Sequence, residues 1–445
     1  MSTKSLHTRS AIRRGTALLA VLTAGALLAG CSSGGGTTAS TSKTPTGTLN
    51  FIVSSSDASD AGFRAVTKAF VKKYPKVKVV FDAIPNANWP ATSASRLTAG
   101  NVDLTLAGPK QVPSYVPASS EGTDARAADS GVYVDLTKQP FMKNFTPTVL
   151  DVTNYKGKQY VVPTGVSYYT GVYYNKAIFK KYNLSIPTTW SQFLTVCSTL
   201  KSHGVAPIGI GGKDGWPAGL TMIAAVQGLY PTQADKVALD KGLWKQTVKL
   251  TDSKPSQVLD RVNTIYKNAQ QNFTGVSYQS IPGGFANGSF AMTADGTWNE
   301  PTIASAVGSK FDFGYFPIPT SNNAADNALL GGKVELTMAV PSNAKNKTAA
   351  LAYLSFFSQP ANYKKFVDLA GFASAEPNIP ASKFLNSIAQ YTKEFSPAWD
   401  TLFFPNPKAG ANAQFPFNYT GVSPLGSSTA EQAAQLSQKD WAAGF

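Results

Sequence analysis

The sequence predicts an α/β protein of two lobes, and two observations indicate it. Segments with strand-like and helix-like patterns alternate from residue 49 onward, and a β-α-β order is typical of a mostly parallel sheet flanked by helices. The part expected to fold, residues 48–445, is longer than the roughly 250–300 residues at which one hydrophobic core usually divides. We therefore expect two lobes.

The first elements follow the order strand, helix, strand, strand. Strands are expected at 49–53, 77–81 and 101–106, which are rich in apolar and β-branched residues. The helix between the first two, 61–74, places its large apolar side chains on one face and is stopped by Pro75. This order predicts parallel pairing of the first strands.

Further helices are marked by their ends. Thr189 and Gln192 form a capping-box pattern at the start of a helix that Gly204 ends. Cys197 lies on the apolar face of that helix, so we interpret it as a core residue and not a reactive thiol. Three more helices are expected, at 347–358, 360–370 and 431–441.

The first thirty residues predict an export signal. Residues 1–15 carry four cationic side chains and no acid, and the apolar stretch 16–28 is shorter than the ~20 residues that a bilayer span needs. The sequence Leu-Ala-Gly-Cys ending at Cys31 is similar to the lipobox of bacterial lipoproteins, in which the cysteine is lipidated and becomes the new N-terminus. The alternative is an ordinary secretory signal that happens to end at a cysteine.

The residues after Cys31 predict a tether. Residues 32–48 are almost entirely Ser, Thr and Gly and cannot bury a core. Their r.m.s. reach is roughly 20–25 Å, at about 5–6 Å times the square root of their number. With the signal at 1–30, we expect 31–48 to be a flexible linker anchored to the membrane by lipid.

Composition narrows the function. The formal net charge is +15, and without the four cations of the signal it is +11. The basic residues are scattered in no nucleic-acid motif, so we expect attraction to an anionic envelope surface and no nucleic-acid partner. Only one histidine, His203, follows the signal, which disfavours His-based catalysis and a multi-histidine metal site. We expect no catalytic residue, no metal and no cofactor.

Five separated segments carry a family resemblance. They are 70–79 (Phe-Val-Lys-Lys-Tyr-Pro, then a strand), 100–104, 162–190 (with Tyr-Tyr-Asn-Lys-Ala-Ile-Phe and Pro-Thr-Thr-Trp), 285–319 (with Gly-Thr-Trp) and 331–341 (with Gly-Gly). In this order they resemble the extracellular solute-binding proteins of ABC sugar importers, the family that includes maltose-binding protein. Val102 stands where the family usually has proline, and residues 395–427 match less well.

The resemblance implies the type II periplasmic-binding-protein fold, in which hinge crossings join two lobes and a cleft between them holds the ligand. By similarity, lobe 1 would be 48–164 plus 333–379, and lobe 2 would be 165–332 plus 380–445. The chain would then be a monomer on the extracytoplasmic face of the bacterial cell membrane. It would capture a carbohydrate there and deliver it to ABC permease subunits without chemistry.

Sugars present apolar faces and a rim of hydroxyls, so their sites need aromatic rings beside polar side chains that bond in pairs. Trp298 follows Gly-Thr at a strand end, where clefts of α/β folds form, and it is the first candidate. Trp216 lies between Gly and Pro in a Gly-rich loop, with Asp214 as a neighbouring hydroxyl acceptor.

Other candidates come from strand ends and lobe crossings. Glu300 could contact ligand or only favour a helix start, and Ser56 and Asp57 could bind ligand or cap the following helix. One of the two adjacent tyrosines at the first crossing should face the cleft, and Gly108 would admit ligand to the backbone. The lysine and glutamate just past the second crossing could form an ion pair in the cleft or bind hydroxyls. These residues are Tyr168, Tyr169, Gly108, Lys333 and Glu335.

Two alternatives remain open. The same fold could bind a non-sugar solute such as a peptide or phosphate. Less favoured is a surface glycan-active enzyme, which would use two carboxylates. Acids are sparse, and no nucleophile, metal or phosphate-loop motif occurs in the chain.

Overall fold

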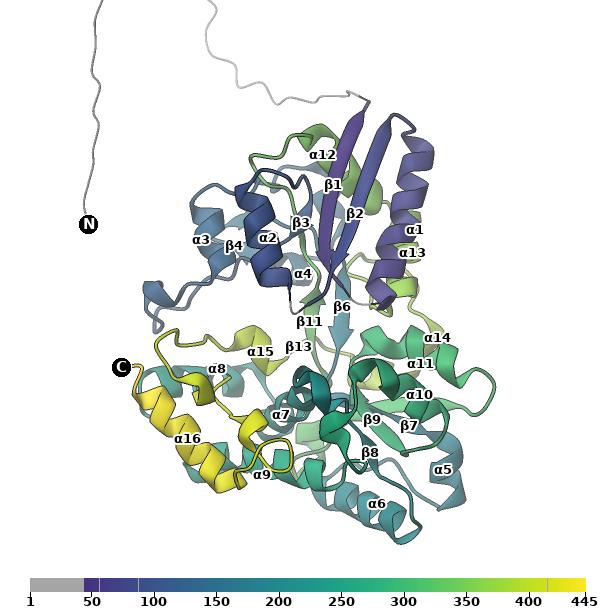
Figure 1. Cartoon of the computed structure of the whole chain (residues 1–445), viewed down its shortest axis with the longest axis vertical. Helices are drawn as coiled ribbons and strands as arrows, with labels where there is room; N and C mark the ends of the chain where they lie inside the picture. The colour runs from purple at the N-terminus through teal and green to yellow at the C-terminus, as the bar shows by residue number, and fades with distance from the viewer. Residues whose placement is uncertain (1–43, 56, 87, 414) are drawn as a thin grey trace, which may run out of the picture. The chain divides into compact units, whose positions relative to one another are not determined.

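The structure is a computed structural model that describes residues 44–445, apart from residues 56, 87 and 414. The predicted signal, Cys31 and nearly all of the predicted linker lie outside the described residues. Residues 44–445 cluster as a single unit (Figure 1). No helix among these residues has the length and apolar character needed to cross a bilayer.

A parallel strand pair begins the first group of elements. β1 (Gly47–Ser54) and β2 (Val77–Ile84) pair along their whole length and are joined by α1 (Asp57–Lys73). Leu104 bridges to Phe51 in parallel just before β3 (Thr105–Leu106). The strands predicted at 49–53 and 77–81 and the helix between them are confirmed, although the helix begins four residues before its predicted start. Of the strand predicted at 101–106, only Thr105–Leu106 forms a strand.

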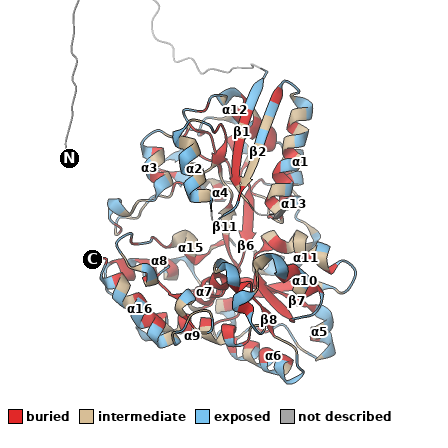
Figure 2. Cartoon of the chain, viewed as in Figure 1, coloured by how far each residue is buried: buried red, intermediate tan, exposed pale blue. Residues whose placement is uncertain are grey.

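Aromatic rings fill the core beneath these strands. Phe51 packs edge-on against Phe63 at 5.3 Å between ring centroids, and Phe63 lies 4.6 Å from Phe366. All three side chains are fully buried. Figure 2 shows that β1, which carries Phe51, consists largely of buried residues where it runs into the fold. Phe366 belongs to α13 (Pro360–Ala370), and α12 (Lys347–Phe357) also packs against β1. Helices late in the sequence therefore complete the core of the first group. Both helices were predicted, and Gly371 ends α13 with φ +69°.

A four-stranded sheet forms the second group, in the order β10-β7-β9-β8. Helices surround it, and α6 carries the capping box of Thr189 and Gln192 that the sequence predicts. Cys197 of α6 is 1% exposed, and burial raises its pKa to about 12, which confirms a core role. The strands are β7 (Gly171–Asn175), β8 (Ile208–Gly209), β9 (Met292–Asp295) and β10 (Phe313–Pro317).

The helices around this sheet, and the smaller elements of the fold, have the following bounds. The second group holds α5 (Lys176–Lys181), α6 (Trp190–Ser202), α7 (Trp216–Leu229), α8 (Gln233–Trp244), α9 (Ser253–Lys267), α10 (Ile281–Ala286), α11 (Glu300–Val307), α14 (Lys383–Ser387), α15 (Trp399–Leu402) and α16 (Ala430–Ala442). The first group holds α2 (Trp89–Thr98), α3 (Thr123–Asp129), α4 (Pro147–Val152), β4 (Asn154–Tyr155), β5 (Lys158–Gln159) and β12 (Met338–Ala339). The helix α16 confirms the predicted final helix.

Three strands lie between the two groups (Figure 1). They are β6 (Gly165–Tyr168), β11 (Gly331–Glu335) and β13 (Ser396–Pro397), hydrogen-bonded in the order β13-β11-β6. These crossing strands approach closely at Gly332, where an added Cβ would lie 2.6 Å from the backbone oxygen of Ser167. Glycine is therefore required there, because any side chain would separate β11 from β6.

A segment of the first group also reaches the second. Val116 is buried in the core of the second group, and the hydroxyl of Tyr115 donates to Asp240 of α8 at 2.8 Å. Lys110 donates to the backbone oxygen of Phe403 at 3.0 Å. Burial lowers the pKa of Lys110 to about 8 and raises that of Asp240 to about 6. This second connection holds the groups together away from the crossing strands.

The prediction of a mostly parallel sheet is wrong. Of the eight strand pairs among the described residues, five run antiparallel. A β-α-β order fixes the direction only of strands joined by one crossover. Here β9 joins its sheet after four α-helices, α7 to α10, and β10 and β11 pair with β7 and β6, which lie far from them in sequence. The sequence pattern therefore leaves their direction open. The predicted lobe boundaries stay a prediction.

Candidate functional site

A cavity of about 780 Å³ lies beside the crossing strands and is lined from both groups of elements. The first group supplies the end of β1, the start of α1 and the loop after β2. The first group also supplies Phe372, which follows α13. The crossing supplies the segment after β6 and the end of β11, and the second group supplies the rest. The polar and aromatic lining residues are Ser54, Ser55, Asn86, Tyr169, Asp214, Trp216, Tyr278, Gln279, Trp298, Asn299, Thr302, Lys333, Glu335, Phe372, Asp400, Phe415 and Tyr419.

Four aromatic side chains form a continuous wall of this cavity. Trp216 begins α7 and is 39% exposed, and its ring centroid lies 4.6 Å from that of Tyr278. Trp298, in the turn after β9, lies 6.4 Å from Trp216 and 5.4 Å from Tyr169. The rings are tilted relative to one another, so the wall presents several faces to a ligand.

A chain of hydrogen bonds holds this aromatic wall in place. The indole N–H of Trp298 donates to the hydroxyl of Tyr278 at 3.0 Å, and that hydroxyl donates to Asp295 at 3.1 Å. Asp295 also accepts from the amide of Asn299 at 2.6 Å and from the backbone N–H of Gly296 at 2.8 Å. Asp295 is fully buried, and burial raises its pKa to about 7. The carboxyl therefore orients the wall from behind.

Charged side chains line the crossing. Lys333 Nζ lies 3.3 Å from Glu335 Oε1, and Ser167 donates to the same oxygen. Burial alone would lower the pKa of Lys333, but the negative charges of Glu335 and Asp400 outweigh the effect of burial and raise this pKa. The ammonium also lies 5.4 Å from the ring centroids of both Tyr169 and Trp298. A cation held against two rings offers donors beside an apolar face.

The arrangement fits a ligand with apolar faces and many hydroxyls. The aromatic wall supplies dispersion contact, and amides, hydroxyls, carboxylates and one ammonium supply directional bonds. The volume lies in the range of small-molecule sites. Among the described residues, no group of three or more His, Cys, Asp or Glu side chains is placed to hold a metal ion.

Six of the predicted site residues line the cavity: Tyr169, Asp214, Trp216, Trp298, Lys333 and Glu335. Asp214 lies in the turn before α7, and its carboxylate accepts from the backbone N–H of Tyr278 at 2.6 Å. Strand ends and crossings thus bring the predicted aromatic and charged residues together. That these residues bind ligand stays a prediction.

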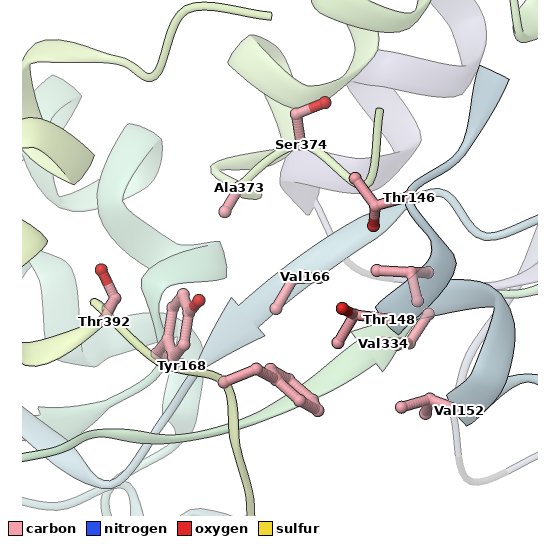
Figure 3. Close-up of a pocket in the computed structure, with 11 residues that line it drawn as sticks. Thr146, Thr148, Val152, Val166, Tyr168, Val334, Ala373, Ser374 and Thr392 are labelled. Atoms are coloured by element: carbon pink, nitrogen blue, oxygen red, sulfur yellow. The ribbon is translucent and has the colours of Figure 1, made fainter. Parts of the chain in front are cut away.

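Tyr168 does not line this cavity. It lies with Val166 and Val334 in a smaller pocket of about 270 Å³ on the other face of the crossing strands (Figure 3). Alternate residues of a strand point to opposite faces. Ser167, Lys333 and Glu335 therefore share the face of the larger cavity, and Val166, Tyr168 and Val334 share the face of the smaller pocket. Of the two adjacent tyrosines, the structure therefore places Tyr169 at the cavity.

Four other predicted residues also lie elsewhere or have side chains that are not described. Gly108 is exposed, and its N–H donates to Asp124 at 2.7 Å instead of facing the cavity. Glu300 is the half-buried first residue of α11, where burial raises its pKa, and it does not line the cavity. Ser56 lies outside the described residues. Asp57 begins α1 and its side chain is not described, but the neighbouring Ser55 lines the cavity.

The sequence of the chain was also compared with known proteins. Residues 54–364 match the profile of the bacterial extracellular solute-binding protein family. The chain belongs to this family. This solute-binding protein is 23% identical over 328 residues to the multiple sugar-binding protein of Streptococcus mutans, covering 73% of this chain and 74% of the relative. It is 21% identical to the melibiose/raffinose/stachyose-binding protein MelE of Bacillus subtilis, covering 61% of this chain and 64% of the relative.

Solved structures share the fold. The solute-binding protein RafE in complex with raffinose superposes with a TM-score of 0.70 at 22% identity, over 88% of this chain and 98% of that one. A sugar transporter of Bacillus licheniformis in complex with stachyose gives a TM-score of 0.71 at 18% identity, over 89% and 100%. The solute-binding protein therefore has the two-lobe type II fold with its cleft between lobes joined by hinge crossings.

Several cavity residues of this solute-binding protein were not predicted from the sequence. Tyr278 lies between helices in a stretch without periodicity, and its role depends on Trp298, twenty residues away. Asp400, Phe415 and Tyr419 come from 395–427. The abundance of aromatic residues in that stretch was the only available signal, and it did not identify which of them face the cavity.

Proposed function

We propose that this solute-binding protein captures a carbohydrate in the larger cavity and delivers it to the membrane permease of an ABC transporter. The observation that carries the proposal is the aromatic wall of Trp216, Tyr278, Trp298 and Tyr169 beside the charged crossing. Relatives named for multiple sugars and for melibiose, raffinose and stachyose support the same ligand class. The residues that line the cavity are the proposed contacts.

We further propose that the protein acts by binding alone. The carboxylates that line the cavity already have structural partners. Asp214 accepts from a backbone N–H, Glu335 pairs with Lys333, and Asp400 accepts from the hydroxyl of Tyr169 at 2.6 Å. Paired carboxylates are poorly suited to act as a nucleophile and a proton donor on a glycosidic bond. The protein is a monomeric receptor in this proposal, and its mass in solution tests the monomer.

The proposed location is the extracytoplasmic face of the cell membrane, with a lipid anchor at Cys31. The lipobox and the Ser/Thr/Gly-rich stretch that follows it support this location. In an exporting host, the chain should be labelled by a fatty-acid analogue and retained with membranes. Cys31→Ala should abolish both, and a variant that stayed labelled would show that the anchor lies elsewhere.

A thermal-shift screen tests the ligand class. A version of the chain starting at Ser32 would be heated with saccharides, amino acids, short peptides or phosphate. A ligand at 100 times its Kd should stabilise the fold by about 2.7 kcal/mol, worth a few degrees in Tm. A shift with one saccharide class, lost in Trp298→Ala, is expected. A shift with peptide or phosphate alone would replace the proposed ligand, and release of product from a glycan would contradict binding without chemistry.

A further inference from the structure

The positive charge of the folded chain is concentrated in two stretches. Residues 44–445 hold 35 Lys and Arg and 25 Asp and Glu. The stretches 61–81 and 336–367 contain ten of these cations and no acid. The other residues hold 25 cations and 25 acids and are balanced, so these two stretches account for the whole excess.

The fold brings the two stretches together. The first contains most of α1 and the start of β2, and the second contains α12 and most of α13, which packs against α1. Lys73, at the end of α1, lies with its ammonium 5.4 Å from the ring centroid of Phe356 in α12. Helix α12 therefore lies across the end of the fold where α1 stops (Figure 1).

Six exposed lysines cluster at this end: Lys72, Lys73, Lys76, Lys78, Lys345 and Lys347. We refer to them as the tether-end lysines. In the part of the chain that the structure describes, none of them forms an ion pair with a carboxylate. Like charges gathered without counter-charges repel one another, so the cluster destabilises the fold slightly unless an anionic partner faces it.

Residues 46–48, at the start of β1, lie beside the tether-end lysines. The backbone N–H of Gly47 donates to the backbone oxygen of Lys76 at 2.9 Å, and Thr48 lies opposite Lys78 in the β1–β2 register. The side chain of Asn346, between Lys345 and Lys347, donates to the backbone oxygens of Thr46 and Thr48. Four of the tether-end lysines therefore lie beside residues 46–48, where β1 begins: Lys76, Lys78, Lys345 and Lys347.

We propose that the tether-end lysines dock this end of the domain onto the anionic lipid headgroups of the membrane. The proposal rests on the proposed anchor at Cys31. Twelve residues separate Cys31 from Thr44, and a chain of that length and composition has an r.m.s. reach of about 20 Å. The anchor thus keeps this end close to the bilayer, so that thermal motion brings the lysines within the Debye length of about 8 Å over which headgroup charge acts.

This orientation has a geometric consequence for the ligand cavity. β1 runs from the tether end to Ser54, and the cavity is lined by Ser54 and Ser55. Eight residues at about 3.3 Å each place the cavity roughly 25 Å from the lysines. Docking would hold the cavity at about that height above the headgroups, in the aqueous phase where solute arrives.

Vesicle co-sedimentation tests the proposal without the lipid anchor. The version starting at Ser32 is suitable because the described core lies wholly within 44–445. It should bind vesicles of phosphatidylglycerol and phosphatidylcholine, but not phosphatidylcholine alone, and 0.5 M salt should release it. A lysine near a charged surface contributes about fivefold in partition. Replacing Lys72, Lys73 and Lys76 by alanine should therefore weaken binding about 100-fold, and replacing Lys345 and Lys347 about 25-fold.

A matched control removes the same charge elsewhere. Lys241, Lys245 and Lys249 are exposed at and after the end of α8, in the second group of elements. Their alanine variant should bind vesicles like the unchanged protein. Docking on lipid would be overturned if both triple variants lost vesicle binding equally, or if neither lost it. It would also be overturned if the protein bound neutral vesicles, or bound soluble polyaspartate as tightly as anionic vesicles. The melting temperature of each variant, with and without saccharide, measures folding and sugar binding independently of vesicle binding. The proposal of sugar capture and the proposal of lipid docking can therefore fail separately.

Discussion

Trp298 offers the sharpest test of the cavity, because two of its interactions can be removed separately. Trp298→Phe keeps an aromatic face but loses the indole N–H that donates to Tyr278 at 3.0 Å. A neutral hydrogen bond contributes about 0.5–1.5 kcal/mol, so this variant should bind saccharide about 3- to 10-fold more weakly through a less ordered wall. Trp298→Ala removes the face as well.

The larger change should have a larger effect. Trp298 contributes to the wall with Tyr169 and Trp216 and lies 5.4 Å from the ammonium of Lys333. Truncation of a tryptophan at the centre of a binding site commonly costs 2–4 kcal/mol. At 1.4 kcal/mol per factor of ten, the Kd should rise about 30- to 1,000-fold.

Isothermal titration with the saccharide found in the thermal-shift screen measures both variants. Melting temperatures without ligand show that the variants fold, and Trp89→Ala serves as a control because Trp89 does not line the cavity. The reasoning is refuted if folded Trp298→Ala binds within threefold of the unchanged protein, or if the alanine and phenylalanine variants bind equally.

Three other predictions concern the fold. Since the pKa of Asp295 rises from 3.8 to about 7, the neutral carboxyl stabilises the fold below pH 4, and this stabilisation is lost as pH rises through 7. Relative to the unchanged protein, the free energy of unfolding of Asp295→Asn should therefore rise from pH 5 to pH 8 by up to about 3 kcal/mol, because the two pH units between 5 and 7 are worth about 1.4 kcal/mol each. Thermal melting at both pH values measures this, and a constant difference in Tm would contradict it. Tyr115→Phe leaves buried Asp240 without one donor and should lower the free energy of unfolding by about 1–3 kcal/mol in urea. Unchanged urea stability would rule out a stabilising role for this contact. Cys197, the single thiol of the version starting at Ser32, should react with Ellman's reagent only in denaturant, and rapid reaction of the folded protein would show that the thiol is accessible.

Local patterns predicted the first strands and five of the helices: α1, α6, α12, α13 and α16. The capping box at Thr189, Pro360 at the start of α13 and Gly371 at its end each fix a helix boundary by short-range chemistry. Trp216 and Trp298 were found because glycine-rich turns after strand-like runs expose side chains at strand ends. In these cases the information lies within a few residues of the feature it determines.

The remaining features depend on contacts distant in sequence. The neighbours Tyr168 and Tyr169 are both buried, so no hydrophobic alternation indicates which one faces the cavity. Tyr278 gains its role from Trp298 and Asp295. The direction of β7, β9 and β10 follows from how their long connections return, which no local pattern records.

The close approach at Gly332 has a consequence for the evolution of ligand choice. A single methyl group there would separate β11 from β6, so substitutions at this glycine should be lost through misfolding before ligand preference can change. The residues proposed to contact the solute come mostly from turns and helix starts, which tolerate sequence variation better than the core of a sheet. New specificities can therefore arise by exchanging wall residues one at a time, while the inherited crossing stays as it is.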